Sequence, residues 1–135
     1  MRVLLDTSYL YDFMEAPGKF FEAERGLFAV RELQLFVSAV SIWEMRLKYR
    51  ARHPSGARKS QYDPIDVLAV LERQDVVFLP LTQDHAAQPL QTPVEHKDPF
   101  DELLLVQAQV EGLKLLTLDR QLAGHPLALT LEGHA

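Results

Sequence analysis

Short apolar runs alternate along this chain with longer segments of helical periodicity, and this alternation limits the possible folds more than any other feature. The runs lie at residues 3–5, 35–37, 76–79 and 114–117, and a possible edge strand lies at 127–129. Such short runs are typical of buried strands. Because helical segments separate them, the strands are expected to pair in parallel with helices on both faces. The sequence therefore predicts an α/β fold with a four- to five-stranded parallel sheet flanked by helices.

Capping residues and breakers predict the helix boundaries. Ser38 is suited to cap a helix over residues 39–51, because its hydroxyl can accept from open backbone N–H groups. The pairs Asp63-Pro64 and Asp98-Pro99 each place an N-cap residue before a proline in the first turn. The predicted helices span residues 7 to about 14, 20 to about 30, 39–51, 64 to about 73, 83 to about 90, 99 to about 111 and 119–123.

The length of 135 residues suits one domain with one core, and neither a linker rich in proline and glycine nor a repeat divides the chain. We therefore expect a single domain over residues 1–135. The absence of cysteine excludes disulfides and thiolate metal sites. The first strand reaches Asp6 too soon for a signal peptide, and no apolar run is long enough to cross a bilayer. We expect a cytoplasmic protein without a membrane segment.

Acidic residues follow the predicted strands at the edge of the sheet where ligands bind in parallel α/β folds. Asp6 and Asp119 come directly after the first and fourth strands, and Asp98 and Asp101 lie at the start of a helix. Glu44 lies about two turns into the helix that follows the second strand. Carboxylate oxygens are preferred ligands of Mg²⁺ and Mn²⁺, whereas carboxylates that cluster without a cation repel one another. The pattern therefore favours a divalent-metal site.

Each of these acids also has a purely structural interpretation, which the residues alone leave open. Aspartate favours the N-cap position of helices, and Asp6, Asp98 and Asp119 could each be such a cap. Asp101 has the spacing of the acidic partner in a capping box. Glu44 could pair with the lysine four residues later on a solvated face. Its helical neighbours are largely apolar, however, and a Glu that faces inward needs a partner.

Three blocks of the sequence resemble the PIN-domain family, in particular VapC-type toxins of toxin–antitoxin pairs. The blocks are LLDTS at residues 4–8, VSAVSIWE at 37–44, and HKDPFDELL with EGLKLLTLD at 96–104 and 111–119. Residues 53–93 resemble the family only in their helix–strand pattern. The resemblance implies a PIN-like fold and endoribonuclease activity that depends on Mg²⁺ or Mn²⁺. It also implies an RNA substrate, a cognate antitoxin as partner, and a homodimer.

The resemblance assigns roles to individual residues. The acidic residues that hold metal and carry catalysis in the family match Asp6, Glu44, Asp101 and Asp119. Asp101 is preferred to Asp98 because the apolar run typical of the family follows it, and Asp98 then serves as a helix cap that supports the site. Thr7 and Thr117 lie beside ligands and could orient them by hydrogen bonds, although Thr117 could equally be an ordinary strand residue.

Two positions depart from the family, which often has a basic residue just after the third acid and another just before the fourth. Here these positions hold Glu102 and Leu118. Neither is a ligand position, so metal binding is expected to survive.

Basic residues are concentrated in one stretch, although the net charge of the chain is −5. Residues 46–59 contain six of the 14 lysines and arginines and no acid. Because phosphate contacts supply much of the affinity for nucleic acid, the stretch provides four candidate RNA-binding residues, which are Arg46, Lys48, Arg50 and Arg52. A solvated helix face explains the same charges equally well. Tyr9, Tyr11 and Phe13 could stack on bases or belong to the core.

Other functions remain compatible with parts of the pattern. A non-catalytic PIN-like binding module would keep the fold, but it would not need the acid cluster. A DNA-directed metal nuclease of related fold usually carries more acids and longer insertions. An aspartyl phosphotransferase of the haloacid-dehalogenase type is disfavoured, because the position two residues after the first acid holds Ser8 instead of a second Asp.

Overall fold

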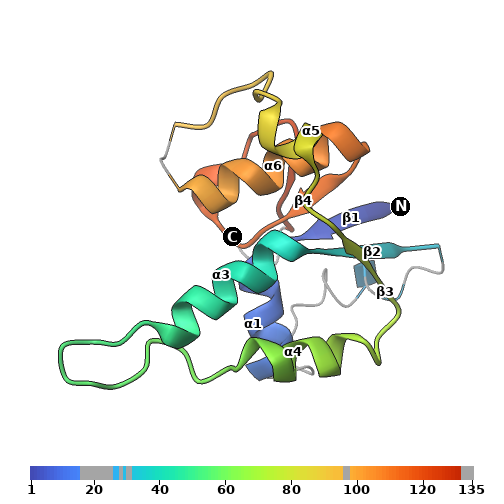
Figure 1. Ribbon diagram of the computed structural model, residues 1–135. Coiled ribbons are helices and arrows are strands. Elements are labelled where there is room, and N and C mark those ends of the chain that lie inside the picture. The colour runs from blue at the N-terminus through green and yellow to red at the C-terminus, as the bar shows by residue number, and fades with distance from the viewer. Residues whose placement is uncertain (16–25, 28, 30–31, 96–97, 132–135) are drawn as a thin grey trace.

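The computed structural model describes residues 1–15, 26–27, 29, 32–95 and 98–131. Within them a single sheet has the strand order β3-β2-β1-β4-β5, and each neighbouring pair is parallel. The strands are β1 (Arg2–Leu5), β2 (Gln34–Ser38), β3 (Val76–Leu79), β4 (Lys114–Leu116) and β5 (Ala128–Leu129). The prediction of a parallel sheet flanked by helices is confirmed, with five strands (Figure 1).

The helices begin where the sequence provides caps. Their bounds are α1 (Thr7–Glu15), α3 (Ala39–Arg50), α4 (Pro64–Leu71), α5 (Gln83–Ala87), α6 (Pro99–Glu111) and the 3₁₀ turn η1 (Arg120–Leu122). Ser38 accepts a hydrogen bond from the Val40 N–H, and Asp63 accepts one from the Ile65 N–H. Gly112 ends α6 in the left-handed conformation, at a φ of 71°, which glycine adopts without strain. The helix expected at residues 20–30 falls almost wholly outside the described residues.

Three predicted boundaries need correction. The helix expected to reach about residue 90 ends at Ala87, because Pro89 disfavours the helical conformation at Gln88, which is extended. The helix expected to reach about residue 73 ends at Leu71 and continues only as a turn. The segment 119–123 forms the 3₁₀ turn η1, which Asp119 caps, and is too short for an α-helix.

Apolar side chains form one packed cluster on each face of the sheet. Leu4 of β1 points into the cluster that includes Leu104 and Leu105 of α6, and Val3 and Leu5 point into the opposite one. This division follows from the period of two along a strand. In Figure 1, α5 and α6 accordingly cover one face, and α1 and α4 cover the other. The described part of the chain contains no helix of the length and apolar character that a bilayer crossing requires.

A buried polar network ties α3, α5 and α6 together. The Ser38 hydroxyl donates to Oε1 of Gln107 at 2.5 Å, and the Gln107 amide lies 3.2 Å from Nδ1 of His85. Nδ1 of His85 also accepts from the Thr82 N–H, so the imidazole proton is on Nε2. Nε2 in turn lies 2.7 Å from the Glu111 carboxylate. The network holds the N-terminal end of α3 against α6, and two acids of the candidate site, Glu44 and Asp101, lie on these same helices.

Candidate active site

Asp6 lies where β1 ends and α1 begins, and its side chain is 4% exposed. Its backbone N–H donates to the Leu116 carbonyl at 2.9 Å, which anchors it beside the end of β4. Its carboxylate accepts from the Thr7 N–H at 2.7 Å and from the Thr117 hydroxyl at 2.6 Å. Burial raises the pKa of Asp6 above its ordinary value, and these two hydrogen bonds partly offset the rise.

Glu44 projects from α3 and is only 8% exposed. Its Oε1 lies 2.9 Å from the Thr7 hydroxyl, and its Oε2 lies 3.0 Å from Nζ of Lys48. The Thr7 hydroxyl is also 2.9 Å from the Ser41 hydroxyl. Since Thr7 has one hydroxyl proton, it can donate to the carboxylate while it accepts from Ser41. Thr7 therefore links the two buried acids, because its N–H binds Asp6 and its hydroxyl binds Glu44.

Asp98 and Asp101 begin α6 and have different environments. Asp98 is exposed, and its Oδ1 accepts from the N–H groups of Phe100, at 2.9 Å, and Asp101, at 3.4 Å. It is therefore the N-cap that the sequence predicts. Asp101 is 8% exposed, and its pKa is raised to about 7, first by burial and then by the charges of Asp6, Asp98, Asp119 and Glu44. Asp101 thus lies within the electric field of every other candidate acid.

Asp119 follows β4 and caps η1, because its Oδ1 accepts from the Gln121 N–H at 2.9 Å. Its own N–H donates to the Thr117 hydroxyl oxygen at 3.0 Å. Thr117 is fully buried, and its hydroxyl therefore accepts from Asp119 while it donates to Asp6. These contacts favour the orienting role over the alternative of an ordinary strand residue.

One pocket of about 490 Å³ brings these residues together at the carboxyl edge of the sheet. Its walls include all five acids named from the sequence, which are Asp6, Glu44, Asp98, Asp101 and Asp119. Lys48, Tyr11 and Asp12 also line it and were not predicted as parts of the acid site. The sequence signal for Lys48 is its position four residues after Glu44, which puts both on one helix face.

The other predicted RNA contacts lie elsewhere. Of the four basic candidates, only Lys48 lines the acidic pocket. Arg46 lines an apolar groove beside Trp43, and Arg52 donates to the Gly56 carbonyl at 2.9 Å. Arg50 lies in the last turn of α3. Leu118, one of the two departures from the family pattern, is part of the pocket wall.

The donor set has the chemistry that a hard divalent cation requires, since carboxylate oxygens are the preferred ligands of Mg²⁺ and Mn²⁺. In the part of the chain that the structure describes, no three histidine, aspartate or glutamate side chains already form a metal-binding group. The acids line a common pocket and affect the pKa of Asp101, but they do not form a closed coordination shell. The fit to a cation is therefore one of donor chemistry and shared location.

Comparison with known proteins agrees with this architecture. The family model of the PIN domain matches residues 3–125. The structure is similar to that of VapBC2 from Rickettsia felis bound to a DNA fragment from its promoter, with a TM-score of 0.67. The two sequences are 13% identical, and the match covers 97% of this chain and 98% of that one. It is also similar to a toxin–antitoxin complex from Klebsiella pneumoniae, with a TM-score of 0.63 and 24% identity, covering 95% and 96%.

A third similar structure is the PIN domain endonuclease Utp24, with a TM-score of 0.52 and 15% identity, covering 98% of this chain and 86% of that one. The search of curated proteins gives no match. At these identities the solved structures support the fold, whereas the family model covers most of the sequence itself. From its sequence and its fold together, the chain belongs to the PIN-domain family.

Proposed function

We propose that this protein is a metal-dependent endoribonuclease that acts as the toxin of a toxin–antitoxin pair. The observation that carries the proposal is the convergence of six carboxylates, five of them predicted from the sequence, on one pocket at the carboxyl edge of the sheet. Two of them, Asp6 and Glu44, are buried and oriented by threonine side chains. Burial of carboxylates is costly unless they are paired or hold a cation, so their retention favours a functional role.

Asp6, Glu44, Asp101 and Asp119 are the residues proposed to hold Mg²⁺ or Mn²⁺. When bound, the cation would polarise the scissile phosphate and activate the attacking water. Thr117 and Thr7 keep the Asp6 carboxylate oriented through hydrogen bonds, and Thr7 does the same for Glu44. The Lys48 ammonium adds a positive charge beside these acids, where it can contact a phosphate of the substrate.

Cleavage of a mixed RNA pool in Mg²⁺ or Mn²⁺ tests this function. We expect the wild type to cut RNA, and we expect Asp6→Ala and Asp101→Ala to lose activity. Asp66→Ala is the matched control, since Asp66 is an exposed residue in the first turn of α4, outside the acidic pocket. Equal activity in all four proteins would exclude this site. Absence of both cleavage and calorimetric Mg²⁺ binding would favour a binding module, and cleavage of DNA alone would favour a DNA nuclease.

The proposed partner is an antitoxin protein, as in the toxin–antitoxin complexes of similar fold. An apolar groove of about 800 Å³ between α3, α4 and β3 supports a protein partner. Its lining includes Trp43, Ile65 and Phe78, which are 46%, 73% and 41% exposed. We expect an antitoxin encoded beside this protein to relieve its toxicity on co-expression, and Ile65→Asp to weaken that relief. Failure of the wild type to bind it would refute the pairing.

The homodimer also remains a proposal, and light scattering of the isolated protein measures it directly. We expect the measured mass to be that of a dimer. A monomer at all concentrations would refute the homodimer, and it would leave the nuclease proposal intact.

A further inference from the structure

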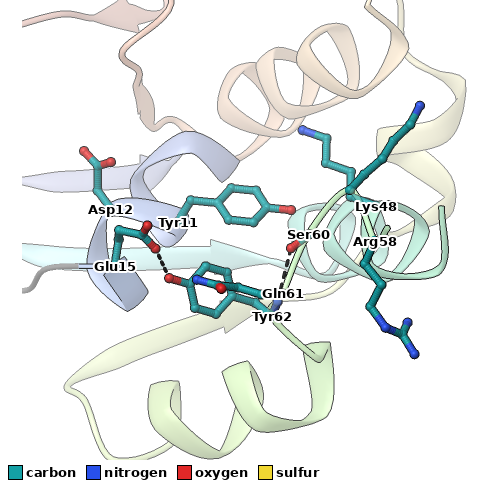
Figure 2. Close-up of a pocket in the computed structure, with 9 residues that line it drawn as sticks. Tyr11, Asp12, Glu15, Lys48, Arg58, Ser60, Gln61 and Tyr62 are labelled. Atoms are coloured by element: carbon teal, nitrogen blue, oxygen red, sulfur yellow. Dashed lines mark hydrogen bonds between the residues drawn. The ribbon is translucent and has the colours of Figure 1, made fainter. Parts of the chain in front are cut away.

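A second pocket, of about 640 Å³, adjoins the acidic one. It lies between the end of α1, the C-terminal half of α3 and the loop at residues 58–62, as Figure 2 shows. Tyr11, Asp12 and Lys48 line both pockets. Because three side chains are shared, the two pockets form one continuous groove, and we call the second part the aromatic pocket.

Two tyrosines form one wall of the aromatic pocket. The Tyr11 and Tyr62 ring centroids are 6.1 Å apart, and the rings are tilted by 50°. The Tyr62 hydroxyl donates to the Glu15 carboxylate, and Figure 2 shows the two side chains meeting across the pocket. This hydrogen bond holds a partly exposed ring in place. A held ring can stack against a base with little further loss of side-chain entropy.

Positive charge extends from the acidic pocket along the same groove. The Lys48 ammonium is 3.0 Å from Glu44 on one side and 5.5 Å from the Tyr11 ring centroid on the other. Arg58 and Lys59 also line the aromatic pocket. Arg58 donates to the Tyr49 carbonyl at 3.0 Å, lies 4.3 Å from the Tyr49 ring centroid and extends away from the tyrosine pair (Figure 2). The cations thus line a path that leads outward from the acids.

We propose that the aromatic pocket is a subsite for one nucleotide of single-stranded RNA, next to the phosphate that is cut. This inference rests on the proposed nuclease function. The base lies against the tyrosine pair, and the adjoining phosphates face Lys48, Arg58 and Lys59. Negative charge on the opposite wall, from Asp12 and Glu15, disfavours a phosphate there and so orients the strand.

The chemistry favours a single strand over a duplex. Bases in a duplex are stacked on their neighbours, so a tyrosine can stack only on a base that is splayed out. Aromatic rings combined with a cationic path are the usual means of holding single strands without sequence-specific contacts. A peptide of an antitoxin is the competing occupant. A fully basic wall would suit an acidic peptide better than this mixture of tyrosines and opposite charges.

Binding of a fluorescently labelled single-stranded RNA of mixed sequence, measured by anisotropy in EDTA so that no strand is cut, tests the subsite. We expect Tyr62→Ala to weaken binding by roughly tenfold, the loss typical of one stacked base. Tyr62→Phe keeps the ring and removes only the hydroxyl that holds it to Glu15, so it should weaken binding much less than Tyr62→Ala does. The same RNA annealed to its complement should bind more weakly to the wild type, and Tyr62→Ala should not change the affinity for this duplex.

Charge reversal at the outer end provides a second variant that does not depend on the packing of Tyr62. Arg58→Glu should weaken binding and reduce the slope of log affinity against log salt by about one phosphate contact. Arg73→Glu makes the same change in net charge outside both pockets and should have little effect. Thermal unfolding of each variant identifies any loss that comes from misfolding.

The outcomes separate the subsite from the nuclease. If the wild type cuts RNA while Tyr62→Ala and Arg58→Glu bind and cut normally, the subsite is refuted and the nuclease stands. If the wild type binds single-stranded RNA through Tyr62 but never cuts it, the nuclease is refuted, and the pocket remains a nucleotide-binding site without a cut phosphate beside it. If Tyr62→Ala and Arg58→Glu lose antitoxin binding while their RNA binding is unchanged, the pocket belongs to a protein partner and the proposal is overturned.

Discussion

The acidic pocket has two halves that use the same type of side chain in different ways. In the inner half, Asp6 and Glu44 are buried and are held by threonine hydroxyls from other parts of the chain. In the cap half, Asp98 and Asp119 accept hydrogen bonds from the backbone at the start of α6 and η1. Local capping explains the cap half without any function, whereas the inner half depends on contacts between distant parts of the chain. Asp101 lies in the cap half but is buried like the inner acids.

The largest effect is expected when the inner half loses a charge. Glu44→Gln keeps the shape of the side chain and removes its negative charge. We expect the rate of RNA cleavage in Mg²⁺ to fall by about a hundredfold or more. Even mutation of a residue that only orients a metal ligand typically lowers metal affinity or activity by about 10- to 100-fold. Glu72→Gln, at the exposed end of α4, is the control. A wild-type rate in Glu44→Gln would remove Glu44 from the site.

A smaller effect is expected when the inner half loses only its support. Thr117→Val keeps the volume and removes the hydroxyl that donates to Asp6 and accepts from the Asp119 N–H. We expect Mg²⁺ affinity by calorimetry and the cleavage rate each to fall by roughly tenfold. Thr130→Val makes the same change at an exposed position. If both variants behave alike, the Thr117 hydroxyl is a structural group without influence on the site.

Within the cap half, Asp98 should matter for stability more than for activity. Asp98→Ala removes the N-cap of α6 and is expected to cost about 1 kcal/mol in the free energy of unfolding, measured with urea. Asp98→Ser keeps a capping oxygen, so it should retain both stability and cleavage. A loss of cleavage in Asp98→Ser with stability intact would show that Asp98 holds metal, and the assignment of Asp101 would then have to be revised.

The last expected effect is in the pH dependence of stability without metal. The folded protein keeps a proton on Asp101 up to a pKa of about 7, whereas the unfolded chain releases it near 3.8. The stability that this proton contributes is present below 3.8 and is lost as pH rises through about 7. In EDTA, the difference in Tm between wild type and Asp101→Asn should therefore change over this window, in favour of the variant at higher pH. A constant difference would contradict the raised pKa.

The predicted elements agree with the structure at the N-caps, whose signals are local. The N-caps Ser38, Asp63 and Asp98 lie where the sequence places them, because a cap depends on only a few consecutive residues. The early end of α5 had a local signal as well, in Pro89, which outweighs the helical pattern before it.

The basic residues show where a pattern in the sequence was too coarse. Arg46 and Arg50 are two and six residues from Glu44, which puts them on the opposite side of α3, whereas Lys48 is four residues away on the same side. Charge density alone could not separate these positions. Helical spacing could, and it would have selected Lys48 before the structure was known.

The sequence by itself determined the alternation of strands and helices, the caps, and the placement of carboxylates after parallel strands, since each depends on neighbouring residues. Only the tertiary structure decided that the Thr117 hydroxyl reaches Asp6, 111 residues away in the chain, and that Thr7 joins Asp6 to Glu44. It also placed the loop at residues 58–62 beside α1. Such contacts depend on how the sheet and its helices pack, and no local pattern of residues specifies that packing.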